Sequence, residues 1–184
     1  MSRIGKAQIL IPAGVTIETQ NGIVTVKGPK GQLTQDIRDF VTIKQEENQL
    51  NVSIADENDG FQKGVWGLTR TLISNMVIGV TVGYQKSLEI VGVGYKFEVV
   101  SPTKLILSVG FSHKVELISP EGVTVEADPT LKNTILIKGI NKQQVGYFAA
   151  KTRAIKKPEP YKGKGIKYVG EYVRRKAGKT GGKK

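Results

Sequence analysis

A repeated heptapeptide is the feature that most limits how this chain can fold. Pro-Ala-Gly-Val-Thr-Ile-Glu occupies residues 12–18 and Pro-Glu-Gly-Val-Thr-Val-Glu occupies residues 120–126, with five of seven positions identical. In each half a later apolar run closes with the same dipeptide, Lys27-Gly28 or Lys138-Gly139. A motif that recurs and is followed in both halves by a similar apolar run indicates two related folding units.

The first half is expected to form strands followed by one helix. Residues 41–45 and 49–54 alternate apolar and polar side chains on either side of a short polar stretch, which predicts a β-hairpin. The helix is expected to begin near Gly60, capped by Asn58 or Asp59, and to end near Gly79. Its predicted inner stripe consists of Val65, Leu68, Leu72 and Met76, with Trp66 and Ile73 alongside.

The second half repeats this order. Strands are expected at residues 87–91, 95–100, 104–109 and 113–117, before the repeated pair of strands. A helix is expected after Asn141 and is stopped by Pro158. Its predicted inner stripe consists of Val145, Phe148, Ala149, Thr152 and Ile155.

These patterns predict an α+β fold with two duplicated domains. Each domain is expected to be a small, mainly antiparallel sheet with one helix packed on one face. We expect the first repeat at residues 1–82, the second at 83–157 and a basic C-terminal extension at 158–184.

Positive charge is concentrated at one end of the chain. The 184 residues contain 28 Lys and Arg against 16 Asp and Glu, a net charge of +12. Residues 151–184 alone hold 13 basic and 2 acidic side chains, so this segment carries +11. Lysine and arginine neutralise phosphates and tyrosine can stack on an exposed base, a combination that suits RNA better than duplex DNA. A disordered, solubilising tail is the alternative, and the tyrosines spaced along the segment count against it.

Several functional classes find no support in the sequence. The chain has no cysteine, and its single histidine cannot assemble a metal site alone, so no metal or cofactor is expected. Gly92-Val93-Gly94-Tyr95 lacks the third glycine and following helix of a nucleotide-binding loop and is expected to be a hairpin or bulge. We predict no catalytic activity and no membrane span. We expect a cytoplasmic location.

The most specific run in the chain is Pro158-Glu159-Pro160-Tyr161-Lys162-Gly163-Lys164-Gly165-Ile166. Its prolines predict that the chain leaves the helix in an extended conformation. With the following Lys-Tyr-Val-Gly-Glu-Tyr-Val-Arg-Arg-Lys at 167–176, it resembles the C-terminal signature of bacterial large-subunit ribosomal protein six. Four other segments are also similar to the family and occur in the family's order. They are Ser-Arg-Ile-Gly-Lys at 2–6, Val-Lys-Gly-Pro-Lys-Gly at 26–31, Gly-Val-Gly-Tyr-Lys at 92–96 and Ser-His-Lys-Val at 112–115.

This resemblance implies a structural constituent of the large (50S) ribosomal subunit that binds 23S-type rRNA through its second domain and tail. It also implies neighbouring ribosomal proteins near the stalk base and the sarcin-ricin loop, with translational GTPase factors in proximity, and no membrane or DNA partner. The expected rRNA-binding residues are Arg153, Lys156, Lys157, Tyr161, Lys162, Lys164, Lys167, Tyr168, Arg174, Arg175, Lys176 and Lys179, with His113 and Lys114.

Two other functions stay open from the residues alone. The charge would equally serve a nucleic-acid-binding regulator or chaperone that acts away from ribosomes. An enzyme with its site on an open sheet face would need a clustered acid, base or nucleophile, and the sequence shows no such cluster.

Overall fold

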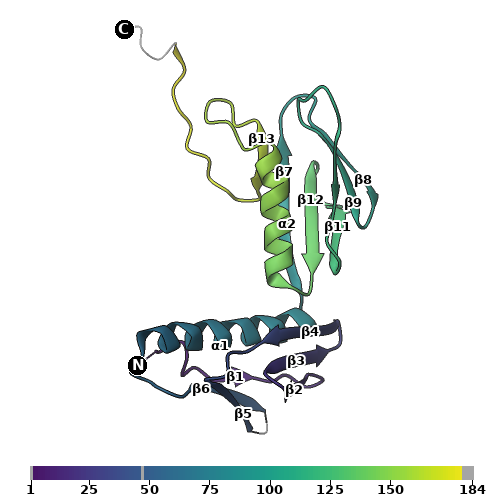
Figure 1. Ribbon diagram of the computed structural model, residues 1–184. Coiled ribbons are helices and arrows are strands. Elements are labelled where there is room, and N and C mark those ends of the chain that lie inside the picture. Colours follow the sequence, from purple (N-terminus) through teal and green to yellow (C-terminus); the bar gives the residue numbers. More distant parts are fainter. Residues whose placement is uncertain (1, 47, 180–184) are drawn as a thin grey trace. The chain divides into compact units, whose positions relative to one another are not determined.

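The chain forms two compact units, each of which combines a helix with antiparallel strands (Figure 1). The computed structural model describes residues 2–46 and 48–179. Unit 1 comprises the described residues up to Tyr84 together with Ile140–Lys142, and unit 2 comprises Gln85–Gly139 and the described residues from Gln143 onward. The predicted α+β class is confirmed.

Unit 1 contains two small sheets and one long helix. One sheet has the order β1 (Ile9–Leu10), β6 (Gln49–Ile54) and β5 (Val41–Glu46), and the other has the order β2 (Thr16–Gln20), β3 (Ile23–Gly28) and β4 (Gly31–Asp36). Helix α1 (Gly60–Thr81) runs along these strands (Figure 1). The predicted hairpin is confirmed, because Val41 pairs with Ile54 and Glu46 with Gln49.

Helix α1 buries Met76, Trp66 and Ile73 as predicted, but the rest of its buried stripe differs from the predicted one. Asp59 caps the helix, its carboxylate accepting a hydrogen bond of 3.0 Å from the backbone N–H of Phe61. Leu68, predicted to face inward, is 57% exposed. Gly79 lies inside the helix, which continues to Thr81 because the first residue with a positive φ after it is Gly83. The buried residues are Trp66, Thr69, Ile73, Met76, Val77, Gly79 and Val80.

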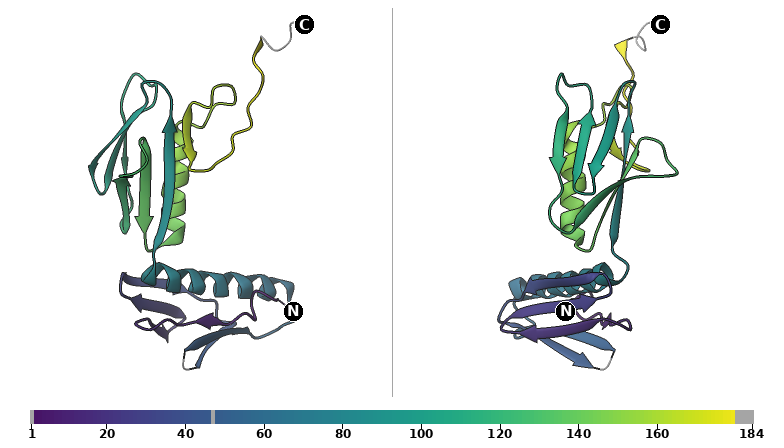
Figure 2. Two further views of the ribbon diagram at one scale, coloured as in Figure 1. Left: turned by 180° about the vertical axis from the view of Figure 1, so that it is seen from behind. Right: turned by 90° about the vertical axis from the view of Figure 1, so that its right-hand side faces the viewer.

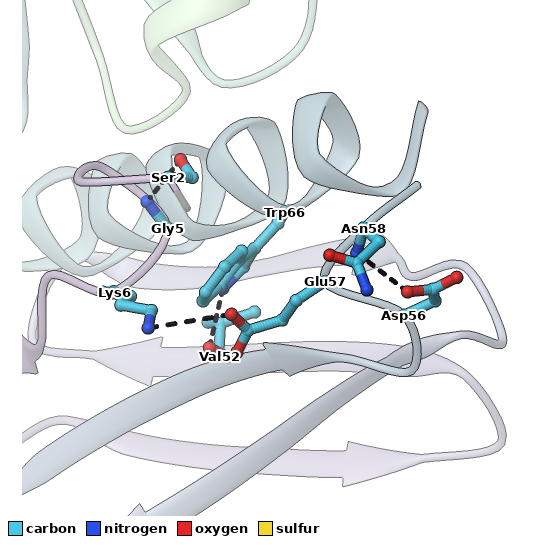
Figure 3. A network of polar contacts seen from close by, with 8 residues as sticks. All are labelled: Ser2, Gly5, Lys6, Val52, Asp56, Glu57, Asn58 and Trp66. Carbon is cyan, nitrogen blue, oxygen red and sulfur yellow. Dashed lines mark hydrogen bonds and ion pairs between the residues drawn. The ribbon is translucent and has the colours of Figure 1, made fainter. Parts of the chain in front are cut away.

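Trp66 explains this rotation of the stripe (Figure 3). Its indole Nε1 donates a buried hydrogen bond of 2.7 Å to the backbone oxygen of Val52, which turns the ring toward β6. Gly5 lies against the indole, where a Cβ atom would stand 2.5 Å from a ring carbon. Ser2 holds this approach because its hydroxyl oxygen accepts a hydrogen bond from the N–H of Gly5. A residue with a side chain at position 5 would therefore displace the segment from Trp66.

Unit 2 packs its helix on one face of a larger sheet (Figures 1 and 2). That sheet has the order β11 (Val123–Ala127), β12 (Thr134–Gly139), β7 (Tyr84–Val91) and β13 (Gly165–Tyr168). A second sheet has the order β10 (Val115–Ile118), β9 (Lys104–Ser108) and β8 (Lys96–Ser101). Helix α2 (Lys142–Ile155) buries Val145, Phe148, Ala149 and Thr152 as predicted, whereas Ile155 is half-buried.

The repeated heptapeptide forms the same turn in both units. The N–H of Val15 donates to the oxygen of Pro12, and the N–H of Val123 donates to the oxygen of Pro120, each at 3.2 Å. The intervening glycines, Gly14 and Gly122, have φ of 84° and 77°. A turn of this kind needs a positive φ at its third position, which glycine adopts without steric cost.

The strand pairs that follow these turns also share a register. Glu18 pairs with Lys27 on the neighbouring strand at 3.1 Å, and Glu126 pairs with Lys138 at 2.6 Å. Both ion pairs are exposed, so each is worth about 0–1 kcal/mol and contributes more to register than to stability.

Strand β13, like β1 and β4 in unit 1, is an element that the sequence analysis does not predict. It pairs antiparallel with β7, with Gly165 opposite Val91 and Tyr168 opposite Leu88, and Ile166 is completely buried. The apolar stretch is too short and too basic to show strand periodicity. Part of the expected C-terminal extension is therefore a strand in the sheet of unit 2.

Replacing Gly139 with alanine is expected to destabilise unit 2 by about 1–3 kcal/mol. The added Cβ would stand 2.7 Å from the backbone oxygen of Gly122 and 2.9 Å from Val145 Cγ2. Urea unfolding followed by circular dichroism would measure the change. Gly146→Ala is the matched control, because that position in α2 has nothing within 4 Å and alanine is the better helix former. Equal unfolding midpoints for the two variants would contradict this account of Gly139.

Candidate nucleic-acid interface

The positive side chains between residues 153 and 179 gather around one end of unit 2, which we call the basic end. It consists of residues 110–114, 153–157, 158–164 and 169–179, together with β13. These segments touch one another: the N–H of Ile166 donates to the oxygen of Lys156, and the N–H of Lys176 donates to the oxygen of Pro160. The C-terminal segment is thus held against the loop that precedes β13, at least as far as Lys176.

The loop at residues 158–164 is a closed turn rather than the extended exit expected. Glu159 closes it by donating its N–H to the oxygen of Lys164 and by accepting the N–H of Gly163 at its own oxygen. Its carboxylate also accepts the N–H of Lys162 at 3.1 Å. Gly165 has φ of 146°, and a Cβ there would stand 2.6 Å from the oxygen of Lys157, so only glycine fits where the chain enters β13.

The carboxylate of Glu171 is the centre of a half-buried network. Arg153 on α2 donates to it through Nε at 3.0 Å and Nη2 at 2.5 Å, in a fork-to-carboxylate geometry. The backbone N–H of Tyr168 donates to the same carboxylate at 3.0 Å. Hydrogen bonds to a charged group are stronger than neutral ones, and the fork adds directional specificity. Glu171 therefore ties the C-terminal segment to α2 and to β13 together.

This network shifts the pKa of both charged partners. The hydrogen bond from Arg153 lowers the pKa of Glu171 below its ordinary value, helped by the N–H of Tyr168. The hydrogen bond to Glu171 raises the pKa of Arg153. Both shifts favour the charged pair, since each group stabilises the ionised form of the other.

Glu171 also covers the open edge of β13. The backbone N–H groups of Ile166 and Tyr168 do not point at β7; they donate to Lys156 and to Glu171. An edge strand with open N–H groups can pair with other chains. These two donors are used within unit 2, so the edge does not present them for further strand pairing.

Most of the predicted cations lie exposed or half-exposed with no acidic partner. Between residues 151 and 179 there are eleven Lys and Arg side chains, and two of them form ion pairs: Arg153 with Glu171, and Lys167 with Glu89 at 3.2 Å. The other nine make no ion pair with a described carboxylate. Those predicted to bind RNA are Lys156, Lys157, Lys162, Lys164, Arg174, Arg175, Lys176 and Lys179.

The histidine loop is only partly brought to this surface. The ring of His113 stacks on Phe111 at a centroid distance of 5.8 Å, and Lys156 Nζ lies 5.0 Å from the Phe111 centroid. His113 therefore joins the basic end through Phe111. Lys114 instead lines a shallow hollow on the β8–β9 sheet with Lys96 and Phe97.

The three tyrosines of the basic end have different environments. Tyr168 in β13 is half-buried, with the cations of Lys86 and Arg153 each 5.9 Å from its ring centroid. Tyr161 is 54% exposed and Tyr172 is 89% exposed. Tyr168 thus contributes to the packing of β13, whereas the other two rings offer faces to a ligand.

Three residues of this surface are absent from the predicted set: Phe111, Glu171 and Tyr172. Glu171 could have been found from its negative charge, because it is one of only two acidic residues in a segment of net charge +11. Phe111 and Tyr172 could have been found as aromatic neighbours of predicted residues.

The described residues show no group of three or more His, Cys, Asp or Glu side chains that could hold a metal ion. Within residues 2–46 and 48–179, no helix has the length and apolar character needed to cross a membrane. The exposed features of the basic end are cations and aromatic rings, which can bind anions and stack on planar groups.

Comparison with known proteins gives matches over nearly the whole chain. The family model described as Ribosomal protein L6 matches residues 11–83 and 91–169, one segment in each half. The chain is 54% identical over 182 residues to large ribosomal subunit protein uL6 of Alkaliphilus metalliredigens, covering 98% of this chain and 99% of that one. It is 53% identical over 184 residues to uL6 of Carboxydothermus hydrogenoformans, covering 100% and 98%. For uL6 of Listeria monocytogenes serotype 4a the identity is 50% over 181 residues, covering 98% and 99%.

The Glu171 network predicts a pH dependence with a defined sign. Because the folded-state pKa of Glu171 is lowered, its stabilising contribution is present above the ordinary glutamate pKa of about 4.3 and is lost as pH falls through the lowered value. The protection factor of the Tyr168 amide against hydrogen exchange should therefore hold from pH 7 to about 4 and fall below that.

Glu171→Gln should lower this protection about tenfold at pH 7 and weaken its dependence on acid. Glu121→Gln is the control with the same change of charge, since Glu121 is exposed in the turn that starts β11. Unchanged Tyr168 protection in Glu171→Gln would contradict the network's role.

Proposed function

Because the chain belongs to the ribosomal protein L6 family and is a structural constituent of the large ribosomal subunit, we propose that it binds large-subunit rRNA through the basic end of unit 2. In bacteria a large-subunit ribosomal protein is cytoplasmic, which agrees with the predicted location. Its contribution to translation is that of a component of the particle.

One observation carries this proposal: eight cations between residues 156 and 179, none paired with a described carboxylate, share the basic end with exposed aromatic rings, on a segment that unit 2 holds in place. Cations near a polyanion replace condensed counterions, which supplies affinity without sequence preference. Contacts to phosphates set the position of the protein, while stacking selects unpaired bases. The basic end offers both kinds of group on one surface.

The residues proposed to contact rRNA are the unpaired cations, the exposed tyrosines and His113. Arg153 and Lys167 belong to this proposal in a different way, since each is already paired with a glutamate and holds β13 in place. The division into residues 1–82, 83–157 and 158–184 stays a prediction.

We further propose the neighbours that the family resemblance implies. They are the rRNA around the stalk base and sarcin-ricin loop, neighbouring large-subunit proteins, and translational GTPase factors in proximity. We propose no catalytic role, because the features that support binding are charge and stacking surface rather than a clustered acid, base or nucleophile.

The salt dependence of rRNA binding tests the proposal. If about six cations meet phosphates, a plot of log affinity against log salt concentration should have a slope of roughly −4 to −5. The double substitution Lys157→Gln with Lys162→Gln should reduce the magnitude of this slope by about 1.4–1.8.

The matched control is Arg38→Gln with Lys44→Gln, which removes two exposed cations of unit 1 that form no ion pair with a described carboxylate. Its slope should equal that of the wild type. Equal effects of the two double variants would mean that the charge acts diffusely and that the interface is not at the basic end.

A further inference from the structure

A hollow of about 370 Å³ lies between β13 and the C-terminal segment of the basic end. Its lining comes from the end of β7, the 158–164 loop, β13 and the segment after it: Val91, Gly163, Lys167, Glu171, Tyr172, Val173 and Arg175. We propose that this hollow receives one unstacked nucleotide of the RNA, with its base against Tyr172 and its phosphate at Arg175. The inference deepens the proposed function and depends on it.

The size of the hollow selects the class of ligand. Sites for small ligands begin at about 300 Å³, so this one has room for a single nucleotide. An intact A-form helix is far wider and would touch only the rim. A nucleotide turned out of a loop or bulge is therefore the RNA element that fits inside.

The charge in the hollow selects an anion. Three ionised side chains line it, but Lys167 is paired with Glu89 and Glu171 is paired with Arg153. Arg175 is the remaining one, and it makes no ion pair with a described carboxylate. Arg175 is exposed, and its Nη2 lies 3.7 Å from where a Cβ on Gly163 would stand, so the guanidinium borders the glycine and can be reached by an approaching phosphate.

The walls suit a planar, partly apolar group. Tyr172 is 89% exposed although its ring is largely apolar, which leaves its faces free for stacking. Val91 and Val173 add apolar lining. Stacking of a base on an aromatic side chain is worth about 1–3 kcal/mol.

The residues beside the hollow provide matched controls. Arg174 has the same charge as Arg175 and Tyr161 is a second exposed tyrosine, but neither lines the hollow.

Binding of the full chain to a large-subunit rRNA transcript at physiological salt is the measurement. Tyr172→Ala should weaken binding about 5- to 150-fold, whereas Tyr172→Phe should stay close to the wild type and Tyr161→Ala should lose less than Tyr172→Ala. Arg175→Gln should lose more affinity than Arg174→Gln.

If Tyr172→Ala and Tyr161→Ala lost equal affinity, and Arg175→Gln and Arg174→Gln likewise, while the wild type still bound, the proposed nucleotide site in the hollow would be wrong. The proposed function would still stand. Failure of the wild-type chain to bind the transcript would instead refute the proposed function.

A Tyr172→Trp variant gives a direct reading of stacking. Trp66 is buried in unit 1, so its emission supplies a constant background. Quenching by the transcript but not by a duplex RNA of equal length would support the unstacked nucleotide. Equal quenching by the duplex, or by a poly-glutamate peptide, would overturn it.

Discussion

The carboxylate of Glu171 is the interaction on which the arrangement of the basic end depends. It accepts three hydrogen bonds, two from the guanidinium of Arg153 and one from the backbone of Tyr168. These donors belong to α2 and to β13, so a single side chain joins the helix, the edge strand and the segment that follows. Like charges along that segment repel one another, and a paired acid at its root gives it a defined starting direction.

Comparison of the two repeats shows which feature of unit 2 accompanies the basic end. Both units share the glycine turn, the strand pair that follows it and an ion pair across that strand pair. Unit 2 differs because the chain continues beyond its helix and returns as β13 beside β7. The added strand brings its flanking cations with it. The asymmetry of charge therefore accompanies the added strand and the segments on either side of it.

Sequence reasoning predicted the parts of the fold that local patterns determine. The hairpin at β5 and β6, most strands of unit 2 and the inner face of α2 follow from alternation and from helical spacing. The buried face of α1 was predicted only in part, because two neighbouring faces of this helix are both apolar. The hydrogen bond from Trp66 to Val52 determines which of the two is buried. Strand β13 and the role of Glu171 depend on contacts with β7 and α2, which are distant in the chain. The charge pattern located the basic end, but it could not separate cations already paired from those left open.

Order in a basic segment changes what its charge can do. Fixing a flexible residue costs about 1–2 kcal/mol of backbone entropy, so a disordered tail loses part of its electrostatic gain when it binds. In this chain the buried Ile166, the hydrogen bond from Lys176 to Pro160 and the Glu171 network meet part of that cost during folding. The open cations are then held near one another before any ligand arrives. Preorganisation of this kind favours a partner whose phosphates match the fixed spacing, so the folding of β13 contributes to specificity as well as to affinity.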